Sequence, residues 1–205
     1  MKNFTFKISK DQLDWIFKPV REKLHVIKVL MRVIKIMLTY QEPTEAQVAG
    51  HFNLTVNSMS RLIFVSKEKI YSINFPFRVT GNIGSLKFYS NHHQDINSKA
   101  TSNILALIDD GIFIEQHVLD FAMPLADRFD IDNDLWALLR ELLLWEDGYI
   151  RYDDDPDNED GDVHPRYHLD VFYSSAATFK LGLRQAIEHV TFADILDVNT
   201  NCQYL

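Results

Sequence analysis

The chain has 205 residues, of which 46% are hydrophobic and 24% charged, so it can bury one large core or two small ones. Its single cysteine, Cys202, excludes a disulfide framework and a cysteine-rich zinc site. Residues 1–12 lack the apolar core of a secretion signal, and the most apolar stretch, 26–38, is interrupted by charged residues. We therefore expect a cytoplasmic protein that does not enter a membrane.

The formal net charge of −8 conceals two halves of opposite sign. Residues 1–100 carry 15 Lys and Arg against 7 Asp and Glu, whereas residues 101–205 carry 6 against 22. A protein that binds nucleic acid needs a local positive face rather than a positive total. The first half could therefore meet phosphate groups, or it could be a solvated basic half beside a solvated acidic one.

Helical patterns dominate the first third of the chain. A short helix is expected over 11–18, ending before Pro19, and a strongly periodic helix over 19–39. Two shorter helices are expected over 46–51 and 55–64, joined by a turn.

Strand patterns begin at residue 69. Residues 69–79 alternate with a period of two, residues 80–84 have turn chemistry, and residues 85–90 predict a returning strand. Further along, the patterns predict helices over 104–108, 115–129 and 133–145, strands over 149–153, 167–173 and 178–183, and an ambiguous short element over 192–197.

The two short helices have the features of a helix-turn-helix. Ala49 is a small residue where two helices would cross, and Thr55 is a suitable N-cap for the second helix. The apolar anchors of such a motif are present at Val48, Phe52, Leu54, Met59 and Leu62. Residues 48–62 thus resemble the helix-turn-helix superfamily, and with their flanking elements residues 20–90 resemble a winged helix.

In winged helices the third helix enters the major groove of DNA and the wing contacts the backbone. Carried over to this sequence, the resemblance implies nucleic-acid contacts from Asn57, Ser58, Ser60 and Arg61 on the helix and from Arg78 and Lys87 on the wing. A winged helix that serves protein contact or dimerisation is the alternative.

The helix over 19–39 carries a basic stripe at helical spacing, formed by Arg21, His25, Lys28, Arg32 and Lys35. Its cations Lys28, Arg32 and Lys35 could track a phosphate backbone. The stripe could equally be a solvated face, or it could dock against the acidic half of the chain.

The second half contains residues suited to proton transfer and charge stabilisation. Arg151 and Asp153 share a side of one predicted strand, and His164, Arg166, His168 and Asp170 would share a side of the next if that segment is extended. Antiparallel pairing could bring Arg151, Asp153, His168 and Asp170 together. His168 would then move a proton, Asp170 would orient the imidazole, and Arg151 or Arg166 would stabilise charge.

Two other interpretations of these residues stay open. His164, His168, Asp153 and Asp170 could bind a divalent metal, although two histidines four apart on a strand reach a common ion only if Pro165 bends the chain. His168 and Asp170 could instead form a structural hydrogen-bonded pair. Our leading expectation assigns no cofactor and no metal ion.

The string Arg151-Tyr152-Asp153, an acidic loop, and His164-Pro165-Arg166-Tyr167-His168-Leu169-Asp170 resembles uncharacterised bacterial families found near toxin–antitoxin and phage-defence loci. Some of these look like small ribonuclease-type toxins. The resemblance covers about residues 149–205 and implies a biological context rather than a defined reaction.

Together these patterns predict an α+β protein with two domains: a winged-helix-like domain over 1–92, then a helical and antiparallel β domain over 93–205. The leading hypothesis is a DNA-binding or complex-forming subunit of a bacterial phage-defence or regulatory system. Its partners would be duplex DNA or another protein, and a homodimer through the apolar flank of helix 19–39 is a third option. The alternative is an enzyme, a nucleic-acid phosphodiesterase that uses the His/Arg/Asp residues.

Overall fold

The computed structural model describes residues 1–91, 95–109, 133–171 and 179–201. Contacts divide the chain into two compact units, each built from separate stretches of sequence. The first unit comprises Met1–Glu22, Glu42–Phe75 and Asp147–Leu205, and the second comprises Lys23–Gln41 and Pro76–Glu146. Helices and a large antiparallel sheet are both present, which confirms the expected α+β class.

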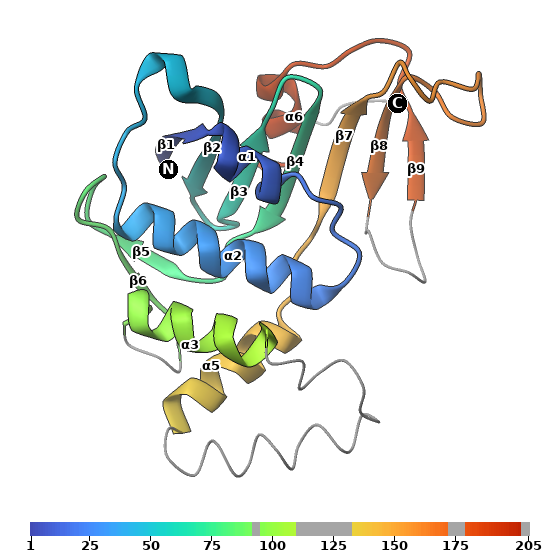
Figure 1. The fold of residues 1–205 in the computed structure, drawn as a ribbon. Helices are drawn as coiled ribbons and strands as arrows, with labels where there is room; N and C mark the ends of the chain where they lie inside the picture. Colours follow the sequence, from blue (N-terminus) through green and yellow to red (C-terminus); the bar gives the residue numbers. More distant parts are fainter. Residues whose placement is uncertain (92–94, 110–132, 172–178, 202–205) are drawn as a thin grey trace. The chain divides into compact units, whose positions relative to one another are not determined.

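The first unit is organised around one seven-stranded antiparallel sheet (Figure 1). Its strands, in spatial order, are β1 (Lys2–Ser9), β2 (Val48–Val56), β3 (Arg61–Val65), β4 (Lys69–Asn74), β7 (Ile150–Asp154), β8 (Tyr167–Val171) and β9 (Phe179–Gly182). β4 pairs with β7, so strands from both sides of the expected boundary near residue 92 belong to one sheet. The sheet is therefore larger than the small one that the sequence predicts.

One row of side chains across this sheet changes character between β4 and β7. Pairing aligns the buried aromatic residues Phe6, Phe52, Phe64 and Tyr71 on neighbouring strands. Their rings lie 4.9, 5.7 and 4.5 Å apart from one neighbour to the next. The same row continues through Arg151, Asp170 and Lys180 on β7, β8 and β9. The charged half of the row contains Arg151 and Asp170, two of the predicted site residues.

The opposite face of the sheet is apolar beneath the last helix. Helix α6 (His189–Ile195) buries Phe192 against Ile63, Ile70, Tyr152 and Leu169. Each of these four strand residues is next in sequence to a member of the row described above, so the two sets lie on opposite faces of the sheet. The ambiguous segment over 192–197 is thus largely helical, and it covers the face that does not carry the charged row.

The expected helices over 46–51 and 55–64 are wrong. The structure has a short 3₁₀ helix, Glu45–Gln47, and then the hairpin of β2 and β3. Phe52 and Leu54 are two residues apart and are both buried, opposite β1 on one side and β3 on the other. Because β1 is more than 40 residues away, this pairing is invisible in a local pattern. The winged-helix arrangement is not confirmed, since a strand of the sheet comes first.

The remaining predicted elements agree better with the structure. In the first unit, α1 (Lys10–Ile16) and strands β7, β8 and β9 occur where helices and strands are expected. In the second unit, α2 (Lys23–Leu38), β6 (Lys87–Tyr89), α3 (Ser98–Asp109) and α5 (Asn133–Leu144) do so too. The single strand expected over 69–79 is instead divided into β4, in the seven-stranded sheet, and β5 (Arg78–Thr80), in a two-stranded sheet with β6. The helix expected over 115–129 lies outside the described residues.

The second unit contains α2, α3 and α5 in mutual contact, together with the two-stranded sheet of β5 and β6. Half of the residues of α2 are buried, among them Val26, Leu30 and Ile34, so its apolar flank is used within the chain. The apolar flank that the expected homodimer would use is therefore already covered by other residues of the same chain. Among the described residues, none of the helices combines the length and the apolar character needed to cross a bilayer.

Candidate functional site

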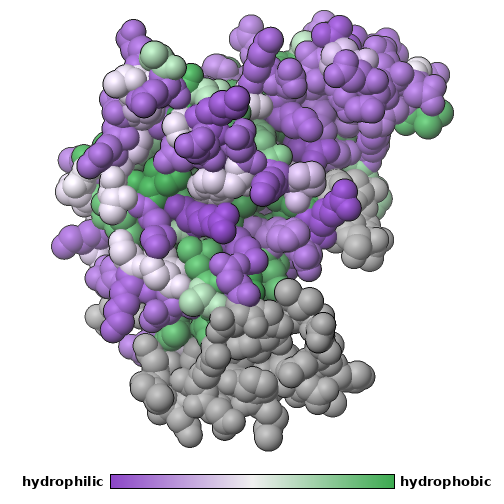
Figure 2. Space-filling model, in the orientation of Figure 1, coloured by the Kyte–Doolittle hydropathy of each residue, from purple (hydrophilic) through white to green (hydrophobic). Residues whose placement is uncertain are grey.

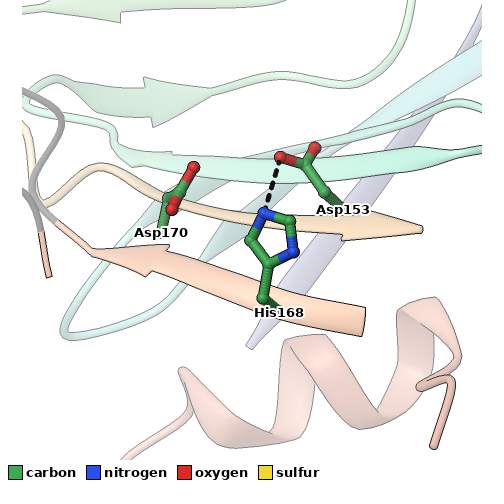
Figure 3. Close-up of side chains that lie close together, drawn as sticks. All are labelled: Asp153, His168 and Asp170. Carbon is green, nitrogen blue, oxygen red and sulfur yellow. Dashed lines mark ion pairs between the residues drawn. The ribbon is translucent and has the colours of Figure 1, made fainter. Parts of the chain in front are cut away.

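The register of β7 and β8 brings four of the predicted site residues together. Arg151 stands opposite Asp170, and Asp153 stands opposite His168. Directly opposed residues on antiparallel strands project from the same face, and positions two apart on one strand share that face. The expected convergence of these four side chains is therefore present. Figure 3 shows Asp153, His168 and Asp170 projecting from the two strands toward one another.

The cluster is buried and linked by ion pairs. The side chains of Asp153, His168 and Asp170 are at most 5% exposed, whereas that of Arg151 is 16% exposed. Arg151 Nε donates to Asp153 Oδ2 at 2.8 Å, and Arg151 Nη2 donates to Asp170 Oδ2 at 2.6 Å. One guanidinium thus bridges both carboxylates, the planar recognition for which arginine is suited.

Both carboxylates are incompletely satisfied. Asp153 Oδ1 and Asp170 Oδ1 are buried, and neither has a hydrogen-bond partner among the described residues. The cluster also contains two anionic side chains but one guanidinium. With a neutral His168 these four side chains sum to a net charge of −1 in a largely buried place, which is unfavourable unless further cations lie nearby.

His168 is held by the backbone rather than by Asp170. Its Nδ1 lies 2.8 Å from the carbonyl oxygen of Pro165, an atom that can only accept, so Nδ1 carries a proton. Its Nε2 lies 3.5 Å from Asp153 Oδ2 (Figure 3). The expected role of Asp170 as the group that orients His168 is therefore wrong, since Asp170 pairs with Arg151.

Gly182 supports this arrangement from the neighbouring strand. It stands opposite His168 on β9, and a Cβ at this position would lie 3.0 Å from Pro165 Cγ. The absence of a side chain lets Pro165 approach the sheet closely, and Pro165 in turn supplies the carbonyl that fixes His168. The imidazole is thus positioned by packing as well as by a hydrogen bond.

Tyr149 extends the cluster toward the aromatic half of the sheet. It is 3% exposed, and burial raises the pKa of its hydroxyl to about 12, although Arg151 acts in the opposite direction. For Arg151 itself, burial alone would lower the pKa, but Tyr149, Asp153 and Asp170 outweigh burial and raise it. Arg151 therefore stays cationic, and Tyr149 stays a neutral phenol, at physiological pH.

Lysines flank the cluster on both sides. Lys69 on β4 stands opposite Asp153, and Lys180 on β9 stands opposite Asp170, so both project from the face of the cluster. Lys180 is exposed, and its Nζ donates to Nδ1 of His164 at 2.9 Å. The sheet thus presents a buried acidic cluster between two cationic side chains.

Two predicted members lie outside the cluster because β8 begins at Tyr167 rather than at His164. The ring of His164 contacts that of His168 edge-on at 4.8 Å, but its Nε2 faces Asp155 Oδ2 at 3.4 Å. Arg166 pairs with Asp154, at 2.7 Å, rather than with the cluster. The expected sharing of one side by His164, Arg166, His168 and Asp170 is therefore wrong for Arg166, whereas the ring of His164 lies beside that of His168 and its Nδ1 accepts from Lys180.

The surroundings of the cluster include the acidic loop between β7 and β8. Figure 2 shows hydrophilic side chains gathered over this loop, and residues Pro156–Val163 are exposed. Its carboxylates are solvated, unlike Asp153 and Asp170. The loop is therefore a useful internal comparison for the buried carboxylates.

Arg61, expected to contact DNA, is a structural residue. It is 8% exposed, and it donates to Ser72 Oγ at 2.9 Å, Asn74 Oδ1 at 2.7 Å and the Gly148 carbonyl at 2.6 Å. Burial lowers the pKa of its guanidinium to about 10. Its donors join β3, β4 and the start of β7, so the expected base or phosphate contact by Arg61 is wrong.

The other expected nucleic-acid contacts are dispersed. Asn57, Ser58 and Ser60 form the turn between β2 and β3, where Asn57 Oδ1 accepts from the Met59 amide at 2.8 Å. In the second unit, Arg78 and Lys87 are exposed on β5 and β6. Also there, Lys28 pairs with Asp109 at 2.7 Å, Lys35 donates to Ser102 Oγ at 2.8 Å, and Arg32 is exposed. The basic stripe is thus partly engaged within its own unit.

Three residues of the site are absent from the sequence predictions: Lys69, Lys180 and Tyr149. Tyr149 could have been found, because it shares the parity of Arg151 and Asp153. Lys69 and Lys180 could not, because their positions depend on the pairing of β4 with β7 and of β8 with β9.

Comparison of the chain with protein-family models, with curated proteins and with solved structures gives no match. Any functional conclusion therefore depends on the site itself.

The metal-binding potential of the cluster follows from its donor atoms. Asp153, His168 and Asp170 each offer one ligand atom, and these atoms lie within 4.8 Å of one another. Chemically, the cluster combines a fixed cation, two carboxylates that can accept protons, and an imidazole nitrogen that faces them. Such a set is suited to phosphoryl chemistry, in which negative charge must be neutralised and water activated.

Proposed function

We propose that this protein is a nucleic-acid phosphodiesterase whose reaction centre is the cluster of Arg151, Asp153, His168 and Asp170. One observation carries the proposal: two adjacent strands gather these groups in a largely buried place, and each carboxylate keeps an oxygen with no hydrogen-bond partner in the part of the chain that the structure describes. Buried polar atoms are nearly always satisfied in folded proteins, so unsatisfied ones call for an explanation such as catalysis or an ion.

Arg151 is the group that would meet the phosphate. A phosphodiester is an anion, and its negative charge grows in the transition state of hydrolysis. The Arg151 side chain is the most exposed of the four, so a substrate reaches it first. Its pKa is raised by its surroundings, which keeps the guanidinium charged throughout the reaction.

The free carboxylate oxygens would supply the base. In the proposed reaction, Asp170 Oδ1 accepts a proton from water, the water oxygen bonds to phosphorus, and one ester P–O bond breaks. The proton is then returned to the leaving oxygen, so that charge and protons balance. His168, anchored by Pro165, lies beside Asp153, with its Nε2 3.5 Å from Asp153 Oδ2.

The flanking lysines favour a polymeric substrate. Lys69 and Lys180 stand on either side of the cluster, spaced by the strands of the sheet. Successive phosphates of a nucleic acid could form ion pairs with these two lysines, whereas a single small phosphoester would need only Arg151.

The proposal is tested by cleavage of end-labelled single-stranded RNA, single-stranded DNA and duplex DNA by the purified full chain. Arg151→Ala should lower the rate by about 10²–10³-fold, the effect of removing one charge-stabilising group. Arg184→Ala, a matched change at an exposed arginine of the same unit, should leave the rate unchanged. The proposal fails if the chain cleaves none of these polymers, or if both variants behave alike.

A DNA-binding or complex-forming subunit of a bacterial defence or regulatory system stays a prediction. Arg61 no longer contributes to it, because its donors are used inside the first unit. The exposed cations Arg78 and Lys87 are the residues on which that hypothesis now depends.

A further inference from the structure

We propose that Asp153, His168 and Asp170 form a binding site for one divalent metal ion, and that this site binds Zn²⁺ more tightly than Mn²⁺ or Mg²⁺. The inference rests on the proposed function, because it names the cofactor class of the same cluster. The donors would be Nε2 of His168 and one carboxylate oxygen from each aspartate.

The protonation of His168 provides the first argument. Because Nδ1 donates to the Pro165 carbonyl, a neutral imidazole presents the lone pair of Nε2 to Asp153. A lone pair and a carboxylate repel one another unless a cation or a proton lies between them. Metal-binding histidines commonly donate the other ring N–H to a backbone carbonyl, the arrangement found here.

The distance between these atoms provides the second argument. His168 Nε2 and Asp153 Oδ2 are 3.5 Å apart. A charge-assisted N–H···O bond would bring them to about 2.7–2.9 Å. Two ligands of a tetrahedral zinc ion, each bonded at about 2.0–2.2 Å, are separated by about 3.4 Å. The observed separation therefore fits a shared metal better than a shared proton.

The unsatisfied oxygens provide the third argument. Asp153 Oδ1 and Asp170 Oδ1 are buried and have no hydrogen-bond partner among residues 1–91, 95–109, 133–171 and 179–201, and their side chains are 3% and 5% exposed. All three donors already lie within 4.8 Å of one another, so closing around an ion requires movements of about 1 Å. The cluster is thus nearly assembled before an ion binds.

Charge gives the fourth argument. Within the cluster, one guanidinium, that of Arg151, faces two carboxylates, and Lys69 and Lys180 stand on the neighbouring strands. A divalent cation reverses the net charge of the cluster from negative to positive. The loaded site would then attract an anionic phosphodiester more strongly than the cluster without an ion does.

The donor set selects the kind of ion. Carboxylates alone suit Mg²⁺ and Ca²⁺, whereas an imidazole shifts the preference toward Zn²⁺ and, more weakly, Mn²⁺. Three protein ligands leave a fourth position for water, as in catalytic zinc sites. An ion there would lower the pKa of that water to about 7 and so replace the free carboxylate in activating it.

Isothermal titration calorimetry of the chelator-treated full chain tests the site, with Zn²⁺, Mn²⁺ and Mg²⁺ as separate probes. We expect one Zn²⁺ per chain, weaker Mn²⁺ binding, and affinity at least about a hundredfold lower in Asp170→Asn and His168→Asn. Asp157→Asn, the same change on the solvated acidic loop, should bind as the unaltered chain does. Absence of stoichiometric binding, or equal loss in Asp157→Asn, would overturn the site.

A second measurement needs no variant and covers the case in which the substituted chains do not fold. X-ray absorption of the zinc-loaded chain should show only nitrogen and oxygen neighbours, including one imidazole. A sulfur neighbour, or no imidazole, would overturn the assignment.

The two proposals fail separately, because calorimetry needs no substrate. Stoichiometric zinc that is lost in Asp170→Asn, with no cleavage of any polymer, would keep the metal site and remove the phosphodiesterase. Full cleavage by chain that binds no metal would keep the phosphodiesterase and remove the metal site.

Discussion

At the scale of single residues, two arginines of the first unit, Arg61 and Arg151, differ in their surroundings. Arg61 is surrounded by neutral acceptors, a serine hydroxyl, an amide oxygen and a backbone carbonyl. Arg151 is surrounded by two carboxylates and keeps a partly exposed side chain. The first arrangement joins strands, whereas the second concentrates charge where a substrate could use it.

Arg61→Ala should destabilise the protein. Its removal takes away the hydrogen bonds that Arg61 donates to Ser72, Asn74 and Gly148, and we expect the free energy of unfolding to fall by about 2–4 kcal/mol. Urea denaturation followed by circular dichroism measures this. A variant as stable as the unaltered chain, but weaker in nucleic-acid binding, would restore Arg61 to the role that the sequence suggests.

His51 should make stability depend on pH. Burial, and to a lesser extent the charge of His189, lower its pKa below the ordinary value of 6.5. The unfolded chain therefore takes up a proton at a higher pH than the folded chain does, and stability falls as pH drops below about 6.5 toward the folded-state pKa. His51→Gln should flatten the stability–pH curve across this window in urea titrations. An unchanged curve would show that the burial of His51 has no energetic consequence.

At the scale of elements, the sequence was informative where two strands that pair with each other are close together in the chain. Residues 149–153 and 167–173 show alternation, a connecting loop and complementary charges, and these features predict the meeting of Arg151, Asp153, His168 and Asp170. Residues 48–62 mislead because Phe52 and Leu54 also fit a helical anchor pattern. Their true partners, Phe6 and Phe4 on β1, are remote in sequence, and tertiary pairing overrides local propensity.

The hairpin of β5 and β6 is the element that carries the remaining DNA-binding hypothesis. If it contacts duplex DNA, Arg78→Ala with Lys87→Ala should reduce the salt dependence of binding, log K against log [salt], by about two units. Fluorescence anisotropy with a labelled duplex at several salt concentrations measures the slope. Lys2→Ala with Lys10→Ala, a matched pair of exposed cations, should change it less. Equal slopes in both double variants would remove the hairpin from the interface.

At the scale of the whole molecule, the two compact units do not follow the order of the chain. Each compact unit takes residues from the basic first half and from the acidic second half of the sequence. The sequence could not show this, because charge counts and linker composition follow chain order, whereas sheets recruit strands from any distance. The candidate site depends on pairing between strands that are distant in sequence, because β4 from the first half places Lys69 beside Asp153 on β7.

The central claim is that the buried cluster, and not the surface charge of the chain, performs chemistry on nucleic acid. The most direct measurement compares initial rates of cleavage of a labelled RNA by the unaltered chain, by Asp170→Asn and by Asp157→Asn, in the presence of Zn²⁺ or Mn²⁺. The account predicts a rate at least about a hundredfold lower for Asp170→Asn and no change for Asp157→Asn. Equal rates for all three chains, or no cleavage by the unaltered chain, would contradict it.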